Sequence, residues 1–83
     1  MRTAVVRVQV DPTGRLMPEQ LTDGMTALRG LADAADIEVL DNNIAAMPAG
    51  RREVEMLMAG GDTDQLKLEA VALCAKAFGT TPT

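Results

Sequence analysis

The sequence predicts one α+β domain in which a strand, a helix, two strands and a second helix follow one another. Apolar residues alternate with a period of two in three segments and recur at spacings of three and four in two others. Turn and helix-capping residues separate these segments. The length of 83 residues suits a single domain, which we expect to span residues 1–79, with residues 80–83 as a frayed tail.

The first strand and the first helix have the clearest patterns. A period of two rich in β-branched residues predicts a strand here, with Ala4, Val6, Val8 and Val10 alternating with Thr3, Val5, Arg7 and Gln9. Asp11-Pro12-Thr13-Gly14 has preferred residues at three positions of a type I turn and ends this strand. Pro18 suits the first turn of a helix. We therefore predict a helix near residues 18–34 whose apolar face consists of Leu21, Met25, Leu28, Leu31 and Ala32.

Two further extended segments, residues 37–40 and 52–58, flank a turn at residues 47–50 and are predicted to form an antiparallel hairpin. One uninterrupted register cannot place both Val39 and Ile44 on the core side. One extra residue restores the phase, so we predict a β-bulge at Asp41 to Asn43. With the bulge placed there, Leu40 is expected opposite Leu57.

Gly60-Gly61 ends the third strand, and Asp62 is a suitable N-cap for a helix near residues 62–78. The right-handed crossover rule places both helices on one face of the sheet, with the third strand between the first two. The predicted fold is therefore ferredoxin-like βαββα, a split βαβ arrangement without its last strand. The expected core consists of Ala4, Val6, Val8, Val10, Ile37, Val39, Val54, Met56 and Met58 in the sheet, with Leu66, Ala70, Leu73, Cys74 and Ala77 on the second helix.

Composition argues against several classes of function. The net charge is −4 and no basic run is present, so we expect no nucleic-acid partner. The sequence has no apolar stretch of about 20 residues and no signal-peptide pattern, so we expect no membrane partner and a cytoplasmic location. A single Cys cannot form an intrachain disulfide. Because the sequence also lacks His, no Cys/His cluster can bind zinc, and we expect no metal and no cofactor.

Three features allow a chemical role, and each has a simpler structural explanation. Cys74 lies on the apolar face of the second helix, where we expect a buried, unreactive thiol. Asp41 to Asn43 offers oxygen ligands, but calcium needs six or more. Gly60-Gly61-Asp62 precedes a helix as an anion cradle does, but its carboxylate would repel a phosphate. No catalytic residue is therefore assigned. An enzyme stays open only because a dimer could bury Glu53 and Glu55.

The sheet face opposite the helices is the candidate interaction surface. Val5, Leu57 and Leu40 are expected in a row across it, with charged neighbours. The predicted interface residues are Val5, Arg7, Leu40, Glu55 and Leu57. Without a fourth strand, the first strand is also an edge that another chain can pair with. The alternative interpretation is that scattered aliphatic residues on a solvated face have no special role.

A chain of this size buries only about 60–65% of the surface that its unfolded form exposes, which favours association as a source of stability. The leading hypothesis is a small non-enzymatic protein-interaction, assembly or regulatory module that self-associates through its sheet, as a homodimer. A different protein partner suits the same surface. The second hypothesis is a dimer whose apposed sheets enclose a pocket for a small ligand, with or without enzymatic chemistry.

Overall fold

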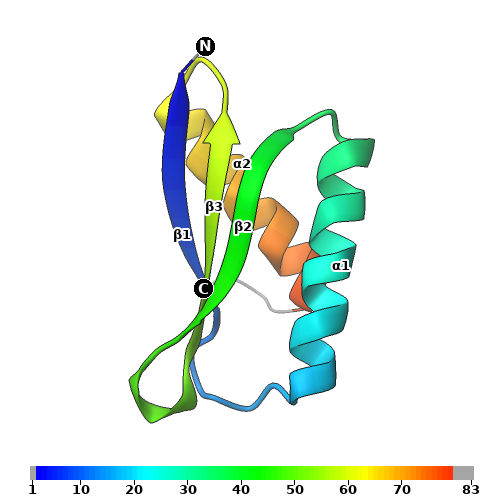
Figure 1. Cartoon of the computed structure of the whole chain (residues 1–83), viewed down its shortest axis with the longest axis vertical. Coiled ribbons are helices and arrows are strands. Elements are labelled where there is room, and N and C mark those ends of the chain that lie inside the picture. Colours follow the sequence, from blue (N-terminus) through cyan, green and yellow to red (C-terminus); the bar gives the residue numbers. More distant parts are fainter. Residues whose placement is uncertain (1, 80–83) are drawn as a thin grey trace.

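The computed structural model describes residues 2–79 (Figure 1). In chain order the elements are β1 (Thr3–Asp11), α1 (Pro18–Ala34), β2 (Glu38–Ala46), the short 3₁₀ helix η1 (Pro48–Gly50), β3 (Arg52–Ala59) and α2 (Thr63–Phe78). Each begins within a few residues of its predicted position, but β2 continues to Ala46, well beyond the predicted segment 37–40. The tail expected at residues 80–83 lies outside the described residues.

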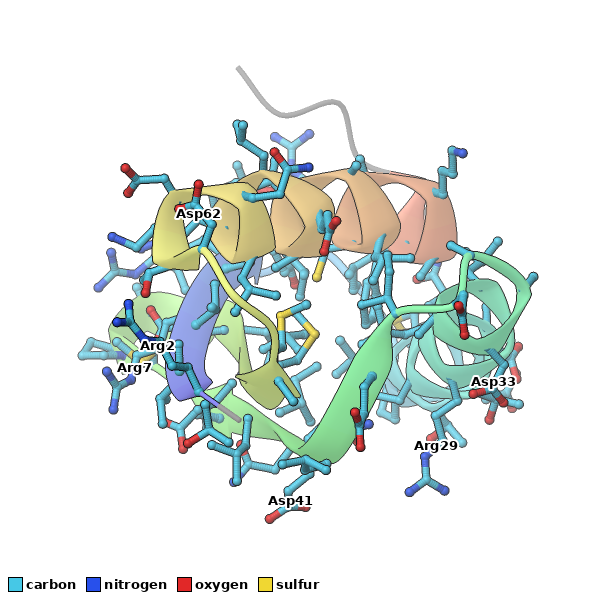
Figure 2. The ribbon with its side chains drawn as sticks, turned by 90° about the horizontal axis from the view of Figure 1, so that it is seen from above. Arg2, Arg7, Arg29, Asp33, Asp41 and Asp62 are labelled. Carbon is cyan, nitrogen blue, oxygen red and sulfur yellow. The ribbon has the colours of Figure 1, made fainter. Side chains whose placement is uncertain are left out.

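The strands form one sheet in the order β1-β3-β2, with β3 antiparallel to both neighbours. Helix α2 crosses behind β1 and β3, and α1 runs alongside β2 (Figure 1). Seen from above, the two helices lie on the same side of the twisted sheet (Figure 2). This arrangement confirms the predicted α+β, ferredoxin-like fold. Because no fourth strand follows α2 within residues 2–79, β1 and β2 are the two edges of the sheet.

Asp11 organises the connection between β1 and α1. Its backbone carbonyl accepts the N–H of Gly14 at 3.4 Å, as expected for the predicted turn. Its buried carboxylate accepts the backbone N–H groups of Arg15 and Leu16, both at 2.9 Å. Burial by itself would raise the pKa of this carboxyl, but these backbone donors and the nearby Arg52 lower it. Asp11 is therefore a structural anion.

Both helices begin at a side-chain acceptor. The backbone N–H of Met17, just before α1, donates to the side-chain oxygen of Gln20 at 2.8 Å. The carboxylate of Asp62 accepts the backbone N–H of Asp64 at 3.0 Å, as its predicted N-cap role requires. Gly79 ends α2 with φ of +66°, a left-handed conformation that favours glycine.

The bulge in the β2–β3 hairpin is present, but it lies earlier than predicted. The register shifts between Val39 and Asp41, so Leu40 is the extra residue. Asp41 lies opposite Leu57, and the expected pairing of Leu40 with Leu57 is wrong. The phase difference between Val39 and Ile44 fixes how many extra residues the strand contains. It does not determine which residue between them is extra.

A second bulge interrupts the β1–β3 ladder and was not predicted. The register shifts between Gln9 and Asp11, which leaves Val10 as the extra residue. Val10 and Asp11 are consecutive and both are buried. Strict alternation would turn one of them toward solvent, so the bulge is what allows the strand to bury both.

The core lies between the sheet and the helices and follows the predicted phases. Its buried members are Val6, Val10, Leu28, Ala32, Val54, Met56, Met58, Leu66, Ala70, Leu73 and Cys74. Four expected residues at the margins of the sheet are only partly buried, namely Ala4, Val8, Ile37 and Val39. Phe78, the only aromatic residue in the sequence, packs against this core from the end of α2.

Candidate functional site

The sheet face opposite the helices carries the predicted interface, with one correction. Val5 is 51% exposed and lies opposite the half-buried Leu57, as expected. Asp41 occupies the third position of this row and points away from the helices (Figure 2). Leu40 is 46% exposed but belongs to the bulge. The row therefore consists of the aliphatic residues Val5 and Leu57 and the carboxylate of Asp41, because the bulge displaces Leu40 from it.

Arg7 and Glu55, the other two predicted interface residues, bind each other. Arg7 Nε–H donates to Oε2 of Glu55 at 3.0 Å, and Oε1 of Glu53 lies 3.9 Å from the same nitrogen. Such exposed ion pairs contribute at most about 1 kcal/mol to stability. They join the guanidinium of Arg7 on β1 to two carboxylates of the neighbouring strand β3.

Acidic side chains dominate this face. Following the strand pairs through β3, its rows within residues 2–79 contain one guanidinium, Arg7, and four carboxylates, those of Glu38, Asp41, Glu53 and Glu55. A second copy stacked on this face would bring like charges together. That arrangement disfavours a contact between two such faces.

The hollow beside Val5, Leu57 and Asp41 is small. Its volume is about 50 Å³, and its lining includes Val5, Leu57 and Asp41. Small-molecule sites typically enclose about 300–1,000 Å³. This hollow has room for water and not for a metabolite, so the row is a surface rather than a pocket.

The two edges of the sheet differ in how they are protected. Beside β2, side chains of α1 form a groove with Val39 and Asn42 to which Arg29 contributes. The bulge at Leu40 and the charge of Asp41 also interrupt this edge. Inserted bulges, charged residues and covering elements all discourage pairing with another chain.

Over residues 3–9, strand β1 has no bulge and no covering element, and its one charged residue there, Arg7, is paired with Glu55. Its bulge is at Val10, near the end of the strand, and residues 3–9 keep a regular register with β3. Within residues 2–79 no other element lies beyond β1 (Figure 1). The backbone edge of β1 is therefore the accessible one.

A polar cleft that the sequence pattern did not reveal lies at the opposite end of the sheet from the hairpin. It encloses about 420 Å³ between the α1–β2 connection and the start of α2. The carboxylates of Asp36, Glu38, Asp62 and Glu69 line it. In the part of the chain that the structure describes, no three His, Cys, Asp or Glu side chains are grouped to hold a metal ion. Finding this cleft requires the packing of both helices, which local periodicity does not give.

Cys74 is buried, as predicted, and burial raises the pKa of its thiol to about 12. A nucleophilic cysteine is exposed and has its pKa lowered by a positive neighbour or a helix N-terminus. Cys74 is therefore a small apolar residue of the core.

Comparison of this chain with known protein families, curated proteins and solved structures found no match in any of the three. No helix within residues 2–79 combines the length and apolarity needed to span a membrane.

Proposed function

We propose that this protein is a small non-enzymatic interaction module that self-associates through its sheet, as a homodimer. The observation that carries the proposal is the contrast between the two edges of the sheet. The β2 edge is bulged, charged and flanked by α1, whereas β1 keeps a regular ladder over residues 3–9. Accessible edge strands present backbone donors and acceptors that pair readily with another strand.

Two further properties support association. The domain is small, so additional burial in a dimer would be a large fraction of its stability. Val5 on β1 is half-exposed, and Ala4 and Val8 on the other face of the same strand are only partly buried. Apolar surface therefore lies on both faces of the accessible edge strand.

The alternative, a ligand pocket enclosed between two apposed sheets, has less support. It requires two copies of the acidic face to approach each other, and the hollow on that face is only about 50 Å³. We assign no catalytic residue, metal or cofactor. The proposed module acts in the cytoplasm through protein contacts, in an assembly or regulatory role.

Light scattering coupled to size-exclusion chromatography tests this proposal directly. Across low to high micromolar concentrations, the molar mass should rise from 8.8 kDa toward twice that value. The rise should persist in high salt, because backbone hydrogen bonds and apolar burial are weakly screened. A molar mass of one chain at every concentration would rule out self-association.

A further inference from the structure

We propose that the partner bound by the β1 edge is β1 of a second copy, antiparallel and centred on Val6, so that the two sheets become one. This inference rests on the proposed self-association and specifies its surface, partner and register. It excludes the sheet face as the main contact.

The structure determines which backbone groups of β1 point outward. The carbonyl of Arg2 accepts the N–H of Gly60 at 3.0 Å, so the backbone groups of Arg2 face the β3 side. Residues of an antiparallel pair alternate between hydrogen-bonded and non-hydrogen-bonded positions. Even-numbered residues before the bulge therefore face β3. The outward N–H and C=O groups belong to Thr3, Val5, Arg7 and Gln9. These four residues are the β1 edge.

These four residues are self-complementary in one register. An antiparallel copy centred on Val6 places Thr3 opposite Gln9 and Val5 opposite Arg7, so all four pair. Centring on Val5 instead places Gln9 opposite residue 1, which lies outside the described residues. Centring on Arg7 places two guanidinium groups directly opposite each other, which is destabilising. Only the Val6 register uses the whole β1 edge and keeps like charges apart.

The same register matches the apolar side chains on both faces of the sheet. On the helix side it places Ala4 opposite Val8 of the second copy, and both residues are only partly buried in the isolated chain. On the other side, Val5 lies next to the aliphatic stem of Arg7, whose charged end is held by Glu55. Each of these contacts occurs twice about the two-fold axis.

The flank of helix α2 beside this edge carries the exposed apolar residue Val71 and, one turn before it, the exposed Lys67. Glu69 lines the cleft next to the α1–β2 connection. At 3.6 residues per turn, Val71 points about 160° away from Glu69, toward the β1 side of the molecule. Val71 is 36% exposed, and Leu68 on the outer surface of α2 is 67% exposed. A two-fold axis normal to the joined sheet puts both copies of α2 on the same face of that sheet.

The decisive substitution is Val5→Pro, with Val5→Thr as its control. Proline removes an N–H that points away from β3, so the fold keeps its own ladder, and edge strands tolerate proline at such positions. The symmetric dimer loses that hydrogen bond twice. We expect the dissociation constant of the dimer to rise at least tenfold for Val5→Pro. Val5→Thr keeps the N–H and the branched shape, and should change the dissociation constant of the dimer much less. Circular dichroism of both variants checks the fold.

Residue-resolved amide hydrogen exchange on the wild-type protein gives a second test that needs no variant. As concentration rises through the dimerisation range, the N–H groups of Val5 and Arg7 should become protected. The outward amides of β2, such as that of Asn42, should not change. This measurement also covers the case in which Val5→Pro fails to fold.

The outcomes separate this inference from the proposed function. A wild-type chain that stays monomeric, even one that binds an unrelated extended peptide, overturns both the second copy as partner and self-association. A dimer that persists in folded Val5→Pro, or that leaves the Val5 and Arg7 amides exchanging freely, overturns the β1 edge alone. A dimer that shows concentration-dependent protection at both amides supports the proposed register.

Discussion

Gly24 and Gly30 lie in the same helix, and we expect the same substitution to have opposite effects at the two positions. An added Cβ at Gly30 meets no atom within 4 Å. Gly30→Ala should therefore show the intrinsic helix propensity alone and raise the free energy of unfolding by about 1 kcal/mol. At Gly24 the added Cβ would overlap three ring carbons of Phe78, which packs on α1 from the end of α2.

The Phe78 ring must move to accommodate Gly24→Ala, and this movement sets the magnitude. Overpacking of this kind costs about 1–3 kcal/mol, and helix propensity offsets about 1 kcal/mol of it. Gly24→Ala should therefore lower the free energy of unfolding by about 0–2 kcal/mol. Because the propensity gain is common to both variants, the two should differ by about 1–3 kcal/mol.

Urea unfolding followed by circular dichroism, at one fixed protein concentration, measures this difference. A double-mutant cycle identifies the cause. In a Phe78→Ala background the clash is absent, so Gly24→Ala should become stabilising by about 1 kcal/mol. If Gly24→Ala stabilises the wild-type protein as much as Gly30→Ala does, the close approach of the two helices at Gly24 is refuted.

Three further predictions concern single residues. Asp11→Ala removes the acceptor of two backbone N–H groups and should lower the free energy of unfolding by about 2–4 kcal/mol near neutral pH. Folding lowers the pKa of Asp11, so its contribution to the free energy of unfolding is complete above the usual pKa of 3.8 and is lost as pH falls through the pKa of the folded state. The urea midpoints of the wild type and the variant should therefore converge in acid. The Cys74 thiol, with a pKa of about 12, should react with a thiol reagent far more slowly than a free peptide until denaturant is added, and equal rates would contradict its burial. Leu40→Glu should leave the molar mass of the dimer unchanged. If this variant were monomeric instead, the sheet face would be the contact.

The fold could be predicted because its signals are local. The alternation around Val6 and Val8 indicated a strand, and Pro18 and Asp62 marked the starts of the two helices. The bulges show where local signals end. The phase of Val39 and Ile44 revealed one extra residue without locating it. The bulge at Val10 was missed because Asp11 was interpreted only as a turn residue, although a carboxylate before a tight turn is also well placed to accept following N–H groups.

Tertiary packing explains what the sequence could not show about the candidate surface. The predicted row depended on register, so the bulge at Leu40 moved one of its three members and brought in Asp41. Helical spacing indicated which faces of α1 and α2 are apolar. It gave no crossing angle, and therefore no indication that Phe78 meets Gly24. The polar cleft between the α1–β2 connection and the start of α2 depends on the same helix placement.

The positions of the two bulges connect the sequence to the proposed function. Both strands beside β3 contain one extra residue, but at Leu40 the bulge lies within the β2 edge, where it increases the local twist and disrupts pairing. In β1 the bulge lies at Val10 and serves to bury Asp11, which leaves the backbone of residues 3–9 regular. The same structural device thus protects one edge and leaves the other able to pair. Association through β1 would then make the stability of this small domain depend on its own concentration.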